Sequence, residues 1–110
     1  MDCIFCKIAN GEIPSDIVFE DDNFKVILDL SPASKGHMLI LPKTHARDIT
    51  ELGEDIAGKA IVLAAKLGKA SMAALGATGF NTLANTGESA GQTVFHCHIH
   101  VIPRYDDASS

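Results

Sequence analysis

The sequence predicts an α+β domain in which one main helix packs on an antiparallel sheet of about five strands. Two patterns predict this architecture: short apolar-rich runs separated by turn residues in both halves of the chain, and one long central stretch with helical periodicity. The chain has 110 residues and shows no internal repeat, low-complexity segment or linker. Residues 1–110 are therefore expected to fold as a single domain.

The first strands are expected to form a hairpin followed by a third strand. Residues 17–20 and 24–28 are apolar-rich and flank the turn-forming segment 21–23, which is typical of a β-hairpin. The third strand is expected at residues 36–41, because Pro42 lacks a backbone N–H and suits a strand end. The short segment before the hairpin is expected to pack at an edge of the sheet.

The central stretch changes to a helical period and predicts one amphipathic helix over residues 55–75. Gly58 and Gly68 each weaken this helix by about 1 kcal/mol relative to alanine, and Gly76 and Gly79 are expected to end it. The apolar positions that define its buried stripe are Ile56, Ala60, Leu63, Ala64, Leu67, Met72 and Leu75.

Two further strands are expected after the helix. Residues 80–84 form the fourth strand, residues 85–93 a loop, and residues 94–102 a fifth strand closed by Pro103. The loop is rich in glycine and hydroxyl groups, so its backbone N–H groups could converge on an anion. Taken alone, the same composition also suits an ordinary connecting loop.

The charge balance limits the partners of this protein. The net charge is −5, and Arg47 and Arg104 are the only arginines, so long nucleic acid is an unsuitable partner. No apolar run approaches the 18 or so residues of a membrane span, and the N-terminus lacks the features of a signal peptide. We therefore expect a cytoplasmic protein without a membrane partner. Any phosphate that it binds must be held by backbone N–H groups, hydroxyls and imidazoles.

Three alternating histidines carry the strongest chemical signal. In a strand, alternate side chains share a face, so His96, His98 and His100 would line one side, with the intervening residues facing the core. The outer two would lie ~13 Å apart, too far for one ion with metal–nitrogen bonds near ~2.1 Å. The pattern instead favours one nucleophilic imidazole with neighbours that orient it and transfer protons. A neutral imidazole is available near pH 7 and forms covalent intermediates.

The segment 96–102 resembles the His-φ-His-φ-His-φ-φ signature of the histidine triad (HIT) superfamily. The resemblance to its nucleotide-binding branch extends in order to residues 3–8, 11–14, 19–22, 29–32, 36–37, 41–45, 85 and 91–94. It implies hydrolysis of nucleoside 5′-phosphoramidates or related AMP conjugates, with a purine nucleotide bound covalently to His98. It also implies a homodimer that pairs through its helix and sheet edge into a ten-stranded sheet.

The resemblance also implies roles for individual residues. His100 and Thr93 would lie near the leaving group, Gln92 near the phosphate, and Asp29 at the ribose hydroxyls. From the residues alone, the context of Asp29 favours an Asx turn over a ribose contact. Asn85 would belong to the binding site, and His96 completes the catalytic triad. Apolar residues that would surround the nucleoside, or that could simply be core, are Ile4, Phe5, Ile8, Ile27 and Leu30.

The spacing of Cys3 and Cys6 is that of a zinc half-site, although two cysteines can also pack as small hydrophobic residues. In zinc-binding members of the superfamily the remaining ligands correspond to His45 and His96, which implies one structural zinc ion per chain. His37 then remains either an active-site neighbour or a structural residue. Cys97 is expected to face the core.

Two alternative functions stay open. The segment 100–104 also resembles the branch that cleaves dinucleoside polyphosphates. A nucleotide-binding regulatory protein with incidental catalysis is the second alternative. Turnover of adenosine phosphoramidate and of a diadenosine polyphosphate would separate these possibilities.

Overall fold

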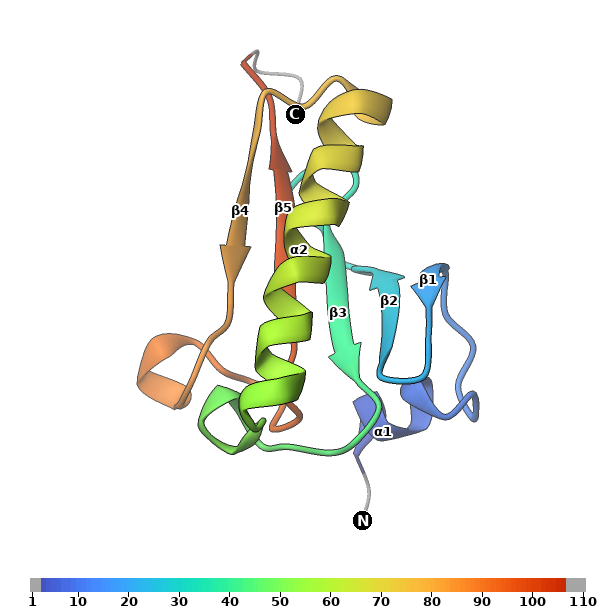
Figure 1. Ribbon diagram of the computed structural model, residues 1–110, viewed down its shortest axis with the longest axis vertical. Coiled ribbons are helices and arrows are strands. Elements are labelled where there is room, and N and C mark those ends of the chain that lie inside the picture. Colours follow the sequence, from blue (N-terminus) through green and yellow to red (C-terminus); the bar gives the residue numbers. More distant parts are fainter. Residues whose placement is uncertain (1–2, 107–110) are drawn as a thin grey trace.

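The computed structural model describes residues 3–106 and contains the five-stranded antiparallel sheet that the sequence predicts (Figure 1). The strand order is β1-β2-β3-β5-β4, so β1 and β4 are the edge strands. The strands are β1 (Ile17–Glu20), β2 (Phe24–Leu28), β3 (Met38–Pro42), β4 (Gly79–Leu83) and β5 (Ile99–Arg104). The helical elements are α1 (Ile4–Ala9), α2 (Glu54–Leu75) and two short 3₁₀ turns, η1 (Ile49–Glu51) and η2 (Glu88–Ala90).

Helix α2 lies across one face of the sheet and builds the main core there (Figure 1). It begins one residue before the predicted start and ends at Gly76, whose φ of 76° places it in the left-handed region. A glycine adopts this conformation without steric cost and therefore ends the helix. Buried side chains of this core are Phe24, Val26, Met38, Ile40, Ala60, Ala64, Leu67, Ile99 and Val101.

Gly68 has a packing role that helix periodicity does not reveal. A Cβ atom built at this position would lie 2.3 Å from two atoms of the Phe80 ring. The ring on β4 therefore approaches the backbone of α2 directly. At Gly58, by contrast, a Cβ atom would have no atom of residues 3–106 within 4 Å apart from its chain neighbours and the nearby backbone of its own helix. The two glycines of the helix are thus not equivalent.

Helix α1 packs on the opposite face, not at the edge of the sheet as we predicted. Its residue Ile8 contacts Ile27, Leu39 and Leu41, which alternate along β2 and β3 with residues of the α2 core. Lys25 is 5% exposed and also belongs to this face, where its ammonium donates a hydrogen bond to the Ile8 carbonyl at 2.9 Å. The expected edge position was wrong because α1 has its own apolar contacts with the sheet.

Strand β5 begins later than predicted, so only one of the three histidines lies on it. We expected the strand at residues 94–102, whereas its backbone pairing begins at Ile99 and the strand continues through Arg104. His96 and His98 belong to a bent segment whose Cys97 N–H donates to the carbonyl of Ala46. Pro103 lies inside β5, beyond the last residue that pairs with β3, where a missing N–H removes no bond to that strand.

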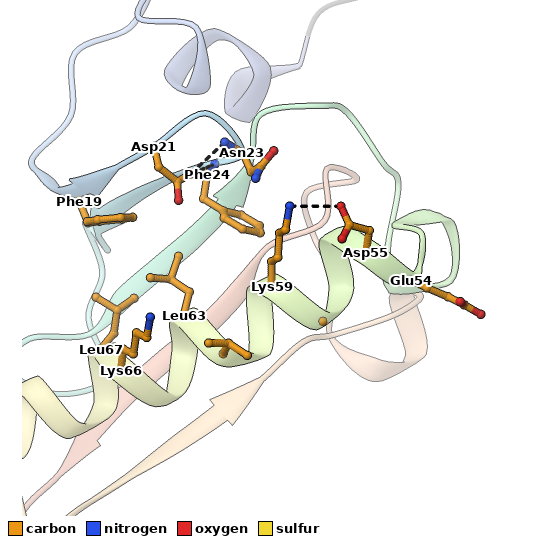
Figure 2. Close-up of a pocket in the computed structure, with 12 residues that line it drawn as sticks. Phe19, Asp21, Asn23, Phe24, Glu54, Asp55, Lys59, Leu63, Lys66 and Leu67 are labelled. Atoms are coloured by element: carbon orange, nitrogen blue, oxygen red, sulfur yellow. Dashed lines mark hydrogen bonds and ion pairs between the residues drawn. The ribbon is translucent and has the colours of Figure 1, made fainter.

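A cavity of about 770 Å³ lies between α2 and the β1–β2 hairpin (Figure 2). Phe19, Phe24 and Leu63 line its apolar part, and Lys59 forms an ion pair with Asp55 at its rim. None of the predicted site residues lines it, because it opens on the α2 side of the sheet. Among residues 3–106, no helix combines the length and the apolar character needed to cross a membrane.

Candidate functional site

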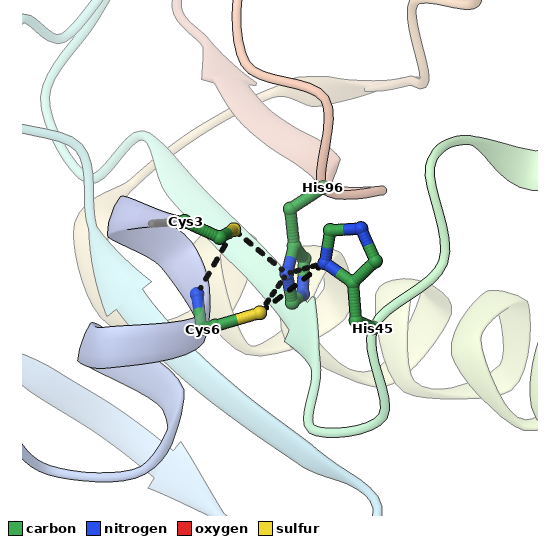
Figure 3. Close-up of side chains that lie close together, drawn as sticks. All are labelled: Cys3, Cys6, His45 and His96. Atoms are coloured by element: carbon green, nitrogen blue, oxygen red, sulfur yellow. Dashed lines mark hydrogen bonds between the residues drawn. The ribbon is translucent and has the colours of Figure 1, made fainter. Parts of the chain in front are cut away.

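Four side chains far apart in the sequence meet beside the N-terminal end of α1 (Figure 3). Cys3 precedes α1 and Cys6 lies within it, whereas His45 follows β3 and His96 lies before β5. The Cys6 Sγ atom is 3.2 Å from His45 Nδ1 and 3.3 Å from His96 Nδ1. The Cys3 Sγ atom is 3.5 Å from His96 Nδ1, and the two Nδ1 atoms are 3.2 Å apart. These are the four residues for which the family resemblance implied a zinc site.

The separations fit one tetrahedral zinc ion. With Zn–S bonds near ~2.3 Å and Zn–N bonds near ~2.05 Å, tetrahedral angles give about 3.6 Å between sulfur and nitrogen and about 3.3 Å between nitrogens. The observed distances of 3.2–3.5 Å lie close to both values. Two thiols and two imidazoles are also the donor set that zinc prefers, and four protein ligands leave no open position for a substrate.

His96 is oriented for this cluster by a hydrogen bond to the backbone. Its Nε2–H donates to the Pro42 carbonyl at 2.8 Å, which leaves the Nδ1 lone pair directed at the two sulfur atoms. The ring is fully buried, and burial lowers the pKa of His96, which favours the neutral form that binds metals. Burial, together with the neighbouring Cys3, raises the pKa of the Cys6 thiol. A cation at the centre of the cluster would offset that cost by stabilising the thiolate.

One ring nitrogen of His98 is hydrogen-bonded to the backbone, and the other forms no hydrogen bond with any of the described residues. Its Nδ1–H donates to the carbonyl of His96 at 2.8 Å. Because a carbonyl only accepts, the neutral ring must carry its proton on Nδ1 and keep a lone pair on Nε2. The ring of Phe5 packs edge-on against it with centroids 4.9 Å apart. This arrangement presents Nε2 as a nucleophile with a fixed orientation.

His37 and His100 form a hydrogen-bonded chain next to His98. The backbone N–H of Ala33 donates to His37 Nδ1 at 3.0 Å, so the neutral His37 ring carries its proton on Nε2. That proton is directed at His100 Nδ1, 2.9 Å away, and the Asp29 Oδ2 atom lies 3.4 Å from the same His37 nitrogen. His100 is thereby held with its own proton on Nε2. His37, whose role the sequence left open, therefore contacts His100 of the candidate site.

Burial lowers the pKa of both His37 and His100. For His100 the neighbouring imidazoles of His98 and His37 lower it further, and for His37 the Asp29 carboxylate partly opposes the effect. The chain is therefore neutral at pH 7, and each ring has one donor and one acceptor. A neutral His100 of this kind donates a hydrogen bond from Nε2, and it becomes a proton donor to a leaving group after it takes up a second proton as imidazolium.

In the predicted phosphate loop, Asn85 and Gln92 form hydrogen bonds with the chain itself, whereas Thr93 is open to solvent. Asn85 Nδ2 donates to the Gly91 carbonyl at 3.4 Å, and Thr93 is exposed. Gln92 is 3% exposed, and its amide hydrogen bonds join three backbone groups of the chain itself. Asp29, predicted at the ribose, also makes the Asx-turn bond that its sequence context favoured, from Ser31 N–H to Oδ1 at 2.9 Å.

The predicted nucleoside residues divide into buried and open positions. Ile8 and Ile27 are buried and Phe5 is half-buried, whereas Ile4 is 52% and Leu30 is 93% exposed. Residues on the same face that the sequence analysis missed are Ile13, Leu39 and Leu41. Leu39 pairs with Ile27 across β2 and β3. This cross-strand pairing is the feature that could have indicated Leu39 as a residue of this face.

The Cys97 thiol lies apart from both histidine clusters. It is 2% exposed, and burial raises its pKa to about 11. Such a thiol is neutral and unreactive at pH 7, as expected for a residue that faces the core.

Comparisons with known proteins agree with this geometry. The sequence model of the HIT domain matches residues 10–107. The Bacillus subtilis protein named Protein hit is 46% identical over 103 residues, which cover 94% of this chain and 71% of that protein. Adenylylsulfatase HINT3 of Arabidopsis thaliana is 43% identical over 94% of this chain and 52% of its own length. The crystal structure of a Zn-bound histidine triad family protein from Mycobacterium smegmatis superimposes with a TM-score of 0.93 at 39% identity, covering 100% of this chain and 81% of that one.

Proposed function

Because the chain belongs to the histidine triad (HIT) family, we propose that it hydrolyses nucleoside 5′-phosphoramidates or related AMP conjugates through a covalent intermediate on His98. The observation that carries this proposal is the fixed His98 ring, whose Nδ1–H is bonded to the His96 carbonyl while Nε2 keeps its lone pair. The name of the relative adenylylsulfatase HINT3 supports a substrate that contains an adenylyl group.

The first step transfers the nucleotidyl group to the protein. His98 Nε2 attacks phosphorus and forms a P–N bond while the bond from phosphorus to the leaving nitrogen or oxygen breaks. His100, held as imidazolium beside the negative charge of the bound phosphate, gives its Nε2 proton to that leaving group and becomes neutral. Thr93 would lie near the same leaving group.

The second step releases the nucleotide. A water molecule attacks phosphorus, His100 takes the proton from the water, and the P–N bond to His98 breaks. AMP leaves, and both imidazoles return to their starting protonation states. Asp29 would accept hydrogen bonds from the ribose hydroxyls, and Asn85 would support the phosphate loop. The purine would contact an apolar set formed by Ile4, Phe5, Ile8, Ile27 and Leu30.

The proposed metal is a structural zinc ion bound by Cys3, Cys6, His45 and His96. Zinc there would supply no chemistry to the reaction, because all four of its positions would be taken by the protein. It would link α1 to the segment that carries His98. The Zn-bound histidine triad protein from Mycobacterium smegmatis supports this assignment.

We also propose a homodimer that pairs through β4. This strand is an edge of the sheet, and such edges require a partner or protection. Ile49 and Ile61 are each more than 40% exposed and line a cavity of about 410 Å³ between α2 and β4, which Thr82 and Ala84 also line. Light scattering should give twice the monomer mass of 11.7 kDa; a mass near 11.7 kDa at micromolar concentration would exclude the dimer.

The decisive experiment replaces the nucleophile. His98→Ala should lower hydrolysis of adenosine 5′-phosphoramidate on the order of 10⁴-fold or more, while AMP binding persists. In His100→Ala, the slowed second step should allow mass spectrometry to detect an AMP adduct on His98. Full activity of His98→Ala would overturn the mechanism. Faster turnover of a diadenosine polyphosphate than of the phosphoramidate would assign the chain to the alternative activity.

A further inference from the structure

The side-chain amide of Gln92 is hydrogen-bonded to three backbone groups of the chain itself. Its Oε1 accepts from the Gly87 N–H at 2.9 Å, and its Nε2 donates to the carbonyls of Arg47 at 2.8 Å and Val94 at 3.1 Å. The side chain is 3% exposed. Both of the N–H donors are therefore engaged within the chain, and neither is left to contact a phosphate.

The three partners of Gln92 belong to two different sites. Arg47 lies two residues after the proposed zinc ligand His45, and Val94 lies two residues before the ligand His96. Gly87 lies in the loop between β4 and β5 whose N–H groups would face the phosphate. The two ligand-bearing segments are also joined directly, because the Cys97 N–H donates to the Ala46 carbonyl. The amide of Gln92 is thus a bridge from the metal-binding segments to the phosphate loop.

We propose that Gln92 is a positioning residue that couples the metal site to the phosphate loop. This inference rests on the proposed zinc and nucleotide sites. A metal that fixes residues 45–47 and 94–96 also fixes the carbonyls of Arg47 and Val94, to which Gln92 donates. Gln92 then holds Gly87 in place, because its Oε1 accepts from the Gly87 N–H. Coupling between two binding equilibria is reciprocal, so an occupied phosphate loop must raise the affinity for zinc.

The test measures zinc affinity without measuring turnover. Zinc is titrated against a chromophoric chelator in the presence of saturating AMP, of adenosine, or of neither. AMP should raise the affinity of the parent protein at least about five-fold, the lower end of typical coupling. Adenosine lacks the phosphate that would occupy the loop, and it should raise the affinity by much less.

Two variants of Gln92 separate the bridge from direct phosphate binding. Gln92→Met removes all three hydrogen bonds, and Gln92→Glu keeps an acceptor for Gly87 but loses both donors to Arg47 and Val94. In both variants the effect of AMP on zinc affinity should fall to about one-fold, even though each protein still binds zinc. Gly68→Ala serves as the matched control, because it disturbs the opposite face of the sheet and should keep the coupling of the parent.

Four other outcomes would overturn the inference, and each identifies which part of it is wrong. If the parent binds zinc and AMP but AMP leaves zinc affinity unchanged, the coupling is absent while the proposed function stands. If AMP still raises zinc affinity in Gln92→Met, the coupling runs through other residues. If Gln92→Met weakens AMP binding and keeps parental zinc affinity and coupling, Gln92 is a direct phosphate ligand. A parent protein that binds no zinc removes the proposed metal site itself.

Discussion

On one face of the sheet α2 buries a continuous apolar core, whereas on the other face α1 is held among thiols, imidazoles and a buried ammonium group. The first face is stabilised by apolar area removed from water, to which every buried side chain contributes a part. The second face has a smaller apolar cluster around Ile8. It adds a few polar contacts at α1, namely the Cys3–Cys6–His45–His96 cluster at one end and the Lys25 bond to Ile8 near the other. The difference suggests that distributed packing secures the fold and localised polar bonds secure the site.

The largest difference between the faces should follow the loss of a metal ligand. Cys6→Ser removes one thiolate from the cluster, and the loss of a bound structural metal removes folding free energy directly. With about 1 kcal/mol shifting the Tm of a chain this size by roughly 4–8 °C, the Tm of zinc-loaded protein should fall on the order of 10 °C or more. Calorimetry and elemental analysis of the same samples provide the measurement.

Cys97→Ala is the matched control, since it removes a buried thiol from outside the cluster. It should keep about one zinc per chain and lose less stability than Cys6→Ser. Equal Tm values and equal zinc contents for Cys6→Ser and the parent would show that Cys3 and Cys6 are packing residues and not metal ligands.

A smaller effect, confined to catalysis, is expected at His37. His37→Phe keeps a ring of similar size but cannot donate to His100 Nδ1. The His100 proton is then free to occupy either nitrogen, and kcat should fall roughly 10²-fold while KM changes little. Steady-state kinetics at pH 7.5 measures this, because the lowered pKa of His37 keeps the parent ring neutral there. A change confined to KM would instead place His37 in substrate binding.

The two faces also differ in how far they could be predicted from the sequence. The α2 face follows from local periodicity, so its helix was located to within one residue. On the other face, the Cys3–Cys6–His45–His96 cluster brings together side chains up to 93 residues apart. Only the family resemblance identified His45 as a partner of Cys6. Strand alternation was the wrong basis for placing His96 and His98, because the chain bends before β5 to bond with Ala46. Nothing local in the sequence marks that long-range bond.

The chain of His37 with His100 was missed for a related reason. Leu39 pairs with His100 across β3 and β5, and this register brings His37 beside His100 on β5. A sequence shows which residues alternate along one strand, but the register between non-consecutive strands depends on packing. Lys25 was missed because a lysine on a hairpin strand is ordinarily exposed.

On the α2 face, Gly68→Ala should have a moderate cost. Alanine gains about 1 kcal/mol of helix propensity, but its Cβ would overlap the Phe80 ring, and overpacking typically costs about 1–3 kcal/mol. We expect a net loss of stability in urea unfolding. Phe80→Leu in the same chain makes room for the methyl group, so the double variant should recover part of the loss. Simple additivity of the two changes would show that they do not share a contact.

Gly58→Ala should have the smallest effect, and of the opposite sign. Apart from its chain neighbours and the nearby helix backbone, no atom of the described residues lies within 4 Å of the added Cβ. The gain in helix propensity of up to about 1 kcal/mol therefore meets no opposing cost. Urea unfolding should therefore show a small increase in stability with an unchanged m-value. Gly58 also lines the cavity between α2 and the β1–β2 hairpin, and the result tests whether that surface is open. If Gly58→Ala destabilises the protein at high concentration but not at low concentration, another copy of the chain must contact α2 at this glycine, and a dimer formed through β4 alone would be an incomplete description.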